Sequence, residues 1–404
     1  MNPQKRPIMR KLATGILALS VLISCEQPAP VLEFSVKNPL NSDRFSETIS
    51  INPEKFASLT ATSGMEKLLI TDKASGDTLV TQLVDNDVDG TPDELLFQLN
   101  LKGGEARQLL ARIAESDPVG KTEGERTTFS RFVPERTDDY AWENDRVAFR
   151  TYGPDAQRRI EENVPGGTLS SGMDAWLKRV EYPIIDKWYK NNEEKEGAYH
   201  IDTGEGYDPY HVGPSRGVGG TGIWVNDSLY TSKNFTAYKT IATGPLRTVF
   251  ELEYAAWNAD SIQVKETKRI SLDLGSNLSR FESVFESGEA LPNITIGLML
   301  HEKEGEVRSE KGKGWFRYWE PMDGSELGVG MIIAPESVLD YKDHRVDYKD
   351  GSQLLIMADP KDNKVVYYAG FGWKKSGQFT NAGEWDAYLE HFAEKIANPV
   401  KVQF

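Results

Sequence analysis

Between Tyr199 and Trp224 the chain reads YHIDTGEGYDPYHVGPSRGVGGTGIW. This segment contains two of the five histidines, one arginine, three carboxylates and three tyrosines, interrupted by seven glycines and two prolines. Imidazoles, carboxylates and phenols transfer protons or bind metal ions. The many glycines and prolines exclude a regular helix or strand interior. The segment is therefore predicted to be a functional loop on a rigid framework, and an exposed structural loop is the alternative.

A hairpin within this segment would bring its histidines together. If the flanks of the turn at Glu205 and Gly206 pair with each other, His200 faces His211. Directly opposed side chains in such a pair lie about 4.5–5.5 Å apart. Two imidazoles at this separation, with Asp202 on the same face, could bind a divalent metal or act as an acid–base pair.

Four more side chains of the segment are candidates for the same chemistry. Tyr207 and Tyr210 carry phenols that can protonate a leaving oxygen, and Asp208 can orient an imidazole. Arg216 lies in the glycine-rich stretch PSRGVGGTGIW, and its guanidinium matches a carboxylate or sulfate bidentately. The spacing is not GxxxxGK[ST] and no βαβ context surrounds it, so a phosphate loop and a dinucleotide fingerprint are both excluded.

Candidates outside the segment are fewer. His301 ends the apolar run ITIGLMLH, where a strand end can present it to a cleft; a satisfied edge histidine is the alternative. Lys187, Trp188 and Tyr189, together with Trp224, are predicted to bind substrate, because aromatic rings beside cations suit an anionic sugar. Core packing with a solvated face is the competing interpretation for the first three. His344 and His391 are expected to have no functional role.

The acidic run DNDVDGTPDEL follows a DxDxDGxxD spacing through Asp85, Asp87, Asp89 and Asp93. Carboxylates at this spacing can surround calcium, which would then be structural. The twelfth loop position is Leu96 rather than the glutamate of an EF-hand. An acidic turn between two strands is the favoured interpretation.

The N-terminus is predicted to be a targeting segment. Residues 1–24 combine four basic side chains with an apolar run from Leu12 to Ile23 that is too short for a stable membrane span. This run ends in Leu22-Ile23-Ser24-Cys25, the pattern of a lipoprotein signal, and Cys25 is the only cysteine. We therefore expect cleavage after residue 24, lipidation of Cys25 and a short tether over residues 25–31. The expected location is the periplasm or cell surface, with the lipid in the outer membrane of a Gram-negative bacterium.

The net charge limits the possible partners. Loss of residues 1–24 changes the formal net charge from −15 to −19. Nucleic acid is therefore not an expected partner, since its binding requires a basic surface. An anionic substrate would have to bind in a locally basic pocket, against the overall field.

Short runs of β-formers separated by turns fill most of the chain and favour an all-β fold. Residues 32–404 are predicted to form one large antiparallel β-sandwich, a supersandwich of the galactose-mutarotase type, with a few short helices. The strands up to about residue 115 could form a sub-domain. The stretch AGEWDAYLEHFAEKIANP has helical periodicity and stops at Asn398-Pro399. A second helix is expected before Pro183.

From residue 34 onward the chain resembles a domain family of formerly unknown function. The resemblance rests on SGMDAWLKRVEYPIIDKWY, on YHIDTGEGYDPYHVGPSRGVGGTGIW, on ATGPLRTVFELEY and on QLVDNDVDGTPDELLFQ. The family is found in lipoproteins encoded in polysaccharide-utilisation loci of Bacteroidetes, and it is identified as including an oligosaccharide dehydratase that acts on ulvan fragments. The resemblance implies an acidic oligosaccharide as substrate.

The implied reaction removes water, or a sugar leaving group, from a non-reducing-end uronic acid and leaves a 4,5-unsaturated sugar. Neutralisation of the carboxylate suits Arg216, abstraction of the C5 proton suits His211 or His200, and protonation of the leaving oxygen suits Tyr210 or Tyr207.

Two other classes of function remain open. A non-catalytic glycan-binding lipoprotein would use Trp176, Trp188, Trp224 and Trp315 as stacking surfaces. A hydrolase or an epimerase is the third possibility, and Glu205 with Asp208 could supply the carboxylate pair of a hydrolase.

Overall fold

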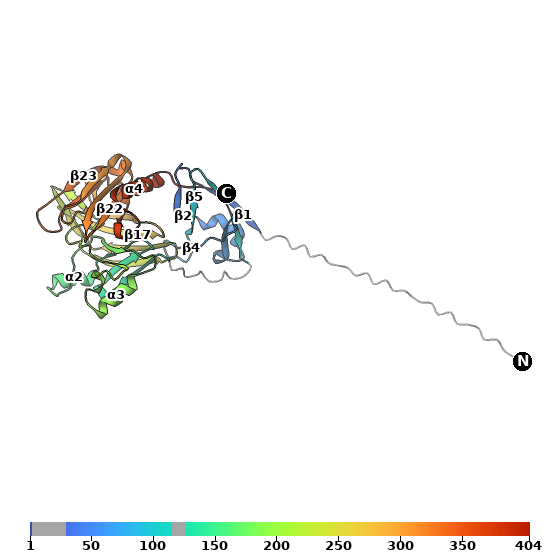
Figure 1. Ribbon diagram of the computed structural model, residues 1–404, viewed down its shortest axis with the longest axis horizontal. Coiled ribbons are helices and arrows are strands. Elements are labelled where there is room, and N and C mark those ends of the chain that lie inside the picture. The colour runs from blue at the N-terminus through green and yellow to red at the C-terminus, as the bar shows by residue number, and fades with distance from the viewer. Residues whose placement is uncertain (2–29, 115–125) are drawn as a thin grey trace.

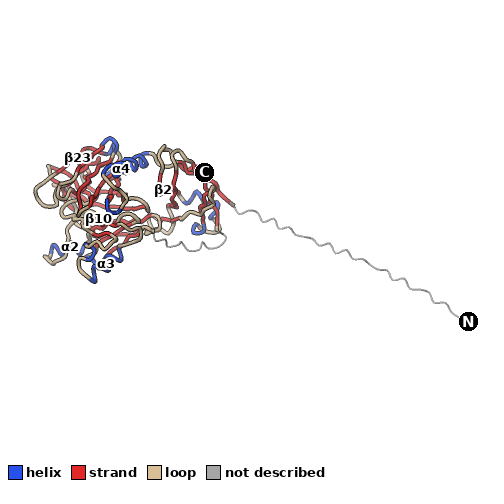
Figure 2. Tube along the Cα trace, in the orientation of Figure 1, coloured by secondary structure: helices blue, strands red, loops and turns tan. Residues whose placement is uncertain are grey.

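The computed structural model describes residue 1, residues 30–114 and residues 126–404. Strands dominate it, as Figure 2 shows, and its sheets pair in antiparallel registers. The prediction of a mainly β, antiparallel sandwich with a few short helices is confirmed. Cys25 and all but the first residue of the predicted signal peptide lie outside the described residues. In the part that is described, no helix is long and apolar enough to cross a bilayer.

The N-terminal strands form two sheets that enclose their own apolar core, seen at one end of the molecule in Figure 1. Phe34, Ile70 and Phe97 lie in this core. The helix α1 (Ala57–Thr60) lies in the same region. The first sheet has the order β26 (Lys401–Gln403), β1 (Val31–Lys37), β6 (Ala106–Ile113), β3 (Leu68–Asp72), and the second β2 (Arg44–Ile51), β5 (Glu94–Leu101), β4 (Thr81–Val84).

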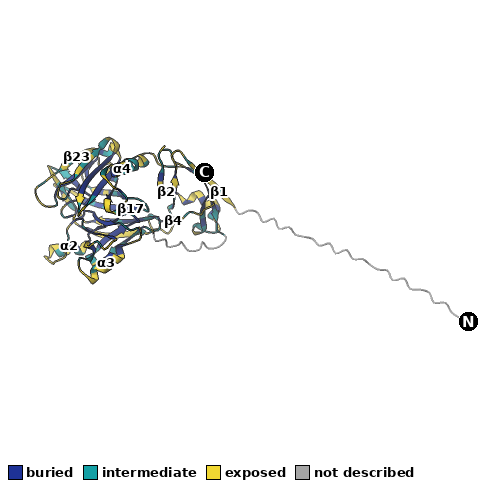
Figure 3. Cartoon of the chain, in the orientation of Figure 1, coloured by how far each residue is buried: buried dark blue, intermediate teal, exposed yellow. Residues whose placement is uncertain are grey.

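The remaining strands form a larger sandwich. One layer is a nine-stranded sheet, in which β16 (Trp257–Ala259) pairs with β17 beside the main path. Aromatic and aliphatic side chains from all its sheets form one continuous core, the dark interior of Figure 3. The main path of the nine-stranded sheet runs β14 (Phe235–Ala242), β15 (Arg247–Tyr254), β17 (Ile262–Asp273), β18 (Leu278–Ser287), β25 (Lys364–Trp373), β22 (Ser325–Ile333), β21 (Trp315–Met322), β20 (Glu306–Glu310).

Two five-stranded sheets form the opposite layer, and an isolated parallel bridge between Met173 and Gly217 joins them. We call this junction the seam. The order of the first sheet is β11 (Gly206–Tyr207), β10 (Asp174–Lys178), β9 (Ala148–Thr151), β8 (Asp139–Glu143), β7 (Phe129–Val133). The order of the second is β13 (Ser228–Tyr230), β12 (Val218–Val225), β19 (Ile294–Met299), β24 (Gln353–Ala358), β23 (Val338–His344).

Three helices accompany the larger sandwich: α2 (Pro154–Glu161), α3 (Ile185–Glu194) and α4 (Ala382–Ala397). The predicted C-terminal helix is confirmed as α4, where Asn381 caps the N-terminus by accepting from the N–H of Glu384. It packs on β21 and β22.

The prediction of a helix before Pro183 is wrong. Asp174–Lys178 form the strand β10, and α3 begins only at Ile185. Alternation explains the strand, since Ala175 and Leu177 enter the sandwich core while Trp176 faces the layer under α3. The start of α3 is instead fixed by a buried carboxylate, Glu143, which accepts from the N–H groups of Ile184 and Ile185.

Candidate functional site

The segment from Tyr199 to Trp224 does not fold back on itself as a hairpin. Gly206 and Tyr207 pair with β10, so the predicted pairing between the flanks of the turn is wrong. The chain then crosses to the seam and enters β12. Two glycines permit this path: a Cβ on Gly206 would lie 1.9 Å from the carbonyl oxygen of Leu177, and one on Gly217 would lie 2.0 Å from that of Met173.

The two histidines of the segment are exposed and do not meet. His200 Nδ1 lies 2.6 Å from the carbonyl oxygen of Asp208. His211 Nε2 lies 3.0 Å from Asp350 Oδ2. Their side chains are 51% and 60% exposed, respectively. Because each ring has its own partner, the geometry does not support the shared metal or acid–base pair that was predicted for them.

Arg216 also lies apart from these histidines, inside the sandwich. Its Nη1 donates to Ser171 Oγ at 2.8 Å, and burial lowers its pKa to about 10, against the nearby Tyr254 and Glu266, which raise it. Glu266 and Lys268 form a buried ion pair at 3.3 Å on the facing strand β17. The sequence predicted that this guanidinium binds a substrate carboxylate. In the structure it is instead buried in the interior of the sandwich.

A buried acid–base constellation lies instead at the seam. The rings of Tyr210 and His301 meet edge to face, with centroids 4.3 Å apart. His301 Nδ1 lies 2.5 Å from Glu320 Oε1, and burial raises the pKa of this carboxyl. Among the residues that the structure describes, neither Tyr210 OH nor His301 Nε2 has a hydrogen-bond partner. Two proton-transferring atoms are therefore left free at the same place, which is unusual for buried polar groups.

The backbone of His301 is part of this arrangement. This residue follows β19 and has a φ of 37°, in the left-handed region that costs energy for a side chain other than glycine. Strained conformations of this kind concentrate at functional sites. The His301 side chain is 10% exposed, while that of Glu320 is 4% exposed, so solvent reaches the imidazole but scarcely the carboxylate.

Next to Tyr210 lies a cluster of buried carboxylates around one arginine. Arg150 Nε donates to Asp174 Oδ2 at 2.6 Å, and its Nη2 donates to Asp208 Oδ2 at 2.8 Å. Tyr152 donates to the same oxygen of Asp174 at 3.3 Å. The second oxygens of Asp174 and Asp208 have no hydrogen-bond partner among the described residues.

Electrostatic interactions connect the carboxylates around Arg150 with the group formed by Tyr210, His301 and Glu320. Burial, followed by the charge of Asp174, raises the pKa of Asp208 well above its usual value, against the attraction of Arg150. Burial, then Glu320 and Asp174, raise the pKa of Tyr210 well above its usual value. Tyr210 is influenced by the charges of both groups, packs on His301 and lies two residues after Asp208, so it connects them. We call the combined set the seam cluster: Arg150, Tyr152, Asp174, Asp208, Tyr210, His301 and Glu320.

Sequence reasoning identified Asp208, Tyr210 and His301 but missed the other four members. A signal for two of them existed. Arg150 and Asp174 are direct partners in the pairing of β9 with β10, and each is a charged residue next to apolar neighbours within a short strand. Glu320 occurs in the aromatic run of β21, and nothing in its neighbours indicates a histidine partner.

The remaining predicted binding residues have structural partners. Tyr207 donates to Asp323 Oδ2 at 3.0 Å. Lys187 Nζ donates to Glu205 Oε1 at 2.7 Å, so Glu205 is not free to form a hydrolase pair with Asp208. Trp188 and Tyr189 belong to α3 and lie on its buried face. Trp176 and Trp315 are also buried, so of the four predicted stacking surfaces only Trp224 is accessible.

Trp224 has two neighbours of its own. Its ring meets His344 edge to face at 5.2 Å and has Lys342 Nζ 4.8 Å from its centroid. This places it on β12 beside β23, away from the seam cluster.

The acidic run forms the turn between β4 and β5. Ligand oxygens of Asp85, Asp87 and Asp89 lie within 4.8 Å of one another, and Asp93 is not in this group. Asp93 Oδ2 instead accepts from the N–H of Asn86 at 2.7 Å. Asp85 accepts from the N–H groups of Val88 and Gly90 at 2.7 Å, bonds that stabilise the turn without an ion.

Comparisons with known proteins concern the chain as a whole. The family described as "Domain of unknown function (DUF4861)" matches residues 36–402. A relative from Formosa agariphila, named "Uncharacterized protein P7", is 46% identical over 390 residues, which are 96% of this chain and 97% of the relative.

Solved structures give a similarity of fold. A protein in the glycosyl hydrolase family 38 from Enterococcus faecalis matches with a TM-score of 0.50 and 9% identity, over 92% of this chain and 47% of its own. An alpha-mannosidase from the same species matches with a TM-score of 0.50 and 10% identity, over 93% and 46%. This chain thus spans about half the length of these structures, and the likeness concerns the fold alone.

Proposed function

The chain belongs to the DUF4861 family, and from this premise we propose that it is a carbohydrate-active enzyme that eliminates water or a sugar from an acidic oligosaccharide. The observation that carries the proposal is the contact between the rings of Tyr210 and His301, because Tyr210 OH and His301 Nε2 are both buried without a hydrogen-bond partner among the described residues. The substrate class follows from the family resemblance. The likeness of fold to glycoside-hydrolase structures supports an activity on carbohydrate.

The proposed reaction breaks two bonds of the substrate, C5–H and C4–O, and forms one π bond between C4 and C5. His301 Nε2 takes the proton from C5 of the uronic acid, and that electron pair forms the double bond between C4 and C5. The bond from C4 to its oxygen breaks, and the oxygen receives the proton of Tyr210. The product is a 4,5-unsaturated uronate, with water or a sugar hydroxyl released. Transfer of the proton from His301 to the Tyr210 phenolate restores the starting state.

Other members of the seam cluster support these steps. Glu320 holds the imidazole through Nδ1, which leaves Nε2 to act as the base and stabilises the charge that the ring gains. Burial raises the pKa of Asp208, and its protonated form could donate from the oxygen that has no partner among the described residues to the substrate carboxylate and thereby acidify C5.

The test uses oligosaccharides that end in a uronic acid with a free 4-hydroxyl. Ultraviolet absorbance follows the unsaturated product, and mass spectrometry separates loss of one water from chain cleavage. His301→Gln should lower the rate by about 10²–10⁴-fold, the usual contribution of a general base. His344→Gln, a histidine on β23, is the matched control and should retain wild-type activity. Full activity in His301→Gln would disprove the assignment.

A second candidate function is hydrolysis, favoured by one observation. Asp174 and Asp208 lie on the same arginine, and one of them has a strongly raised pKa, as the acid of a glycosidase pair does. New reducing ends without ultraviolet absorbance would establish this alternative.

The attachment to the membrane is a separate proposal. We propose that Cys25 carries the lipid that holds the mature protein on the outer membrane. Cys25→Ser should move the protein from the membrane fraction to the soluble fraction of the cells, and an unchanged distribution would exclude this anchor.

A further inference from the structure

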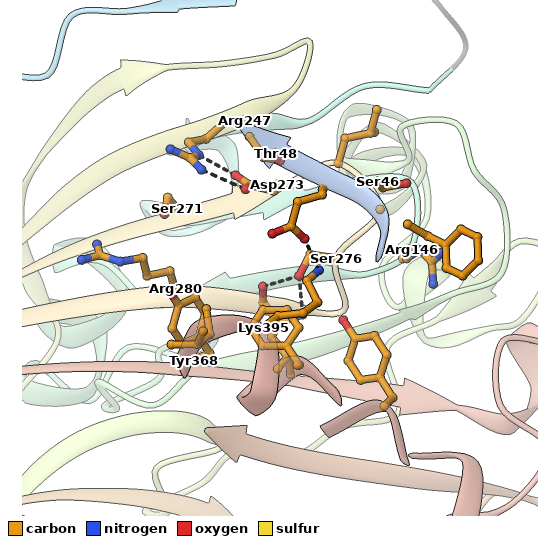
Figure 4. A pocket seen from close by; sticks show the side chains of 18 of the residues that line it. Ser46, Thr48, Arg146, Arg247, Ser271, Asp273, Ser276, Arg280, Tyr368 and Lys395 are labelled. Atoms are coloured by element: carbon orange, nitrogen blue, oxygen red, sulfur yellow. Dashed lines mark hydrogen bonds and ion pairs between the residues drawn. The ribbon is translucent and has the colours of Figure 1, made fainter. Parts of the chain in front are cut away.

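A cavity of about 380 Å³ lies between the N-terminal sheets and the larger sandwich, away from the seam cluster. Residues from β2, from the turn between β17 and β18 and from α4 line it, and Figure 4 shows it from close by. Its volume falls in the range of roughly 300–1,000 Å³ that is typical of small-molecule sites. No step of the proposed reaction uses it.

The cavity is positive although the protein is acidic. Four lysine or arginine residues and two carboxylates line it, in a chain whose net charge is −15. Asp273 pairs with Arg247 at 2.5 and 2.9 Å, and Arg247 also contacts Glu94 at 3.1 Å. Glu47 pairs with both Lys395 and Arg44 at 2.6 Å, so these three cations and three carboxylates balance one another. The positive charge that remains belongs to Arg146 and Arg280.

These two arginines are available to a ligand to different degrees. Arg146 Nη1 donates to a neutral partner, Asn277 Oδ1, at 3.3 Å, and within residues 30–114 and 126–404 no ion pair holds it. Arg280 Nη2 donates to Glu282 Oε2 at 2.7 Å, but Glu282 also pairs with Lys364 and is thus shared between two cations. Figure 4 shows Arg280 beside Tyr368 on one side of the cavity and Arg146 on the other.

Apolar surface lies close to these charges. Tyr368, Tyr388 and Phe392 line the same cavity, and aromatic faces of this kind pack against the C–H faces of sugar rings. Hydroxyl groups of Ser46, Thr48 and Ser276 add neutral hydrogen-bonding atoms. A guanidinium at each side, with aromatic rings and hydroxyls between, matches a short saccharide that carries a negative group on each of two sugars.

We propose that this cavity is a binding site for an acidic disaccharide unit, distinct from the site of catalysis. The inference rests on the proposed function for its substrate class but shares no residue with the seam cluster. The site gives an acidic protein a local means of holding an anionic chain against its own field.

The test measures binding by titration calorimetry with the full chain. Digalacturonic acid is the probe, and the neutral disaccharide galactobiose is its uncharged counterpart. Digalacturonic acid should bind, and galactobiose should bind at least about tenfold more weakly, because each lost charge-assisted contact costs roughly that factor. Arg146→Gln and Arg280→Gln should each weaken binding of the acid by about tenfold.

Two controls make the result decisive. Lys265→Gln removes one positive charge from an exposed site on β17 and should leave the affinity unchanged. Arg146→Lys keeps the charge but not the fork, and should bind with an intermediate affinity. Thermal unfolding of each variant shows whether it is folded, and Arg146→Lys retains the test if Arg146→Gln does not fold.

The outcomes separate this site from the catalytic one. Equal binding of the two disaccharides, absence of binding to the wild type, or loss of binding in Tyr210→Phe but not in the arginine variants would each overturn the cavity proposal. Binding that depends on Arg146 without any unsaturated product would instead retain the cavity and disprove the proposed elimination.

Discussion

Histidine occurs in two contrasting surroundings in this protein. His200 and His211 lie on a glycine-rich segment with their rings largely exposed. His200 contacts the carbonyl oxygen and, at 3.6 Å, the carboxylate of Asp208, and His211 contacts Asp350. His301 lies at a strand end, against Tyr210, with its Nδ1 held by a buried glutamate. The difference shows that chemistry depends on orientation and burial more than on the number of reactive residues in a stretch of sequence.

The largest expected effect comes from Tyr210→Phe. The variant keeps the ring that packs on His301 and removes only the hydroxyl, so the fold should be unchanged. The elimination rate should fall about thousandfold, or about 4 kcal/mol in activation free energy. Steady-state kinetics measures this loss, and circular dichroism verifies the fold. A variant with more than a tenth of wild-type activity would remove Tyr210 from the mechanism.

Glu320→Gln should have the next largest effect. The amide can still accept from Nδ1 but no longer stabilises the charged imidazole, so kcat should fall by about tenfold to hundredfold. The acidic limb of the pH–rate profile should move to lower pH, because the negative charge that favours protonation has gone. An altered KM with an unchanged profile would indicate a purely structural role.

The buried carboxyl groups also predict that the stability of the protein depends on pH. Burial raises the pKa of Asp139 from 3.8 to about 6, against the attraction of Arg150 and Arg136. A raised pKa in the folded state gives a stabilising contribution that is complete below the unfolded-state pKa and is lost as pH rises through about 6.

Asp139→Asn does not ionise, so it should gain stability relative to the wild type, on the order of 1–2 kcal/mol, between about pH 4 and pH 7. Urea unfolding at both pH values measures the difference. A constant difference between variant and wild type would show that Asp139 remains ionised in the folded protein.

The smallest effect is expected for His211→Gln. The imidazole in its pair with Asp350 is 60% exposed although the carboxylate is 10% exposed, and pairs open to solvent contribute about 0–1 kcal/mol. Activity should stay within about twofold of wild type, and stability should change by less than about 0.5 kcal/mol. A large loss of activity would show that His211 takes part in catalysis and that the contrast between the exposed and the buried histidines is wrong.

The sequence was informative where local patterns determine structure. Alternating strands and the periodicity of Ala382–Ala397 predicted the class of fold and helix α4. Local patterns failed at Asp174–Lys178, where a short helix was expected before Pro183 but every residue is buried in a strand.

The same reasoning predicted only some of the residues of the seam cluster. Tyr210 and His301 could be selected by residue type, but their meeting requires β19 and the entry to β12 to lie side by side at the seam. Such a juxtaposition depends on long-range strand pairing, which no single segment encodes. The pairing of His200 with His211 failed for the same reason, since β10 rather than the segment itself supplied the partner strand.

Strand β26 determines when the sheet that contains β1 can be completed. Lys401–Gln403 pair with Ser35, Val36 and Lys37, so the outer edge of β1 remains open until residues 401–403 have been synthesised. An open edge can recruit strands from other chains. Strand β1 is therefore among the last of the described strands to gain its second neighbour, and a chaperone that shields its open edge until then would prevent such pairing.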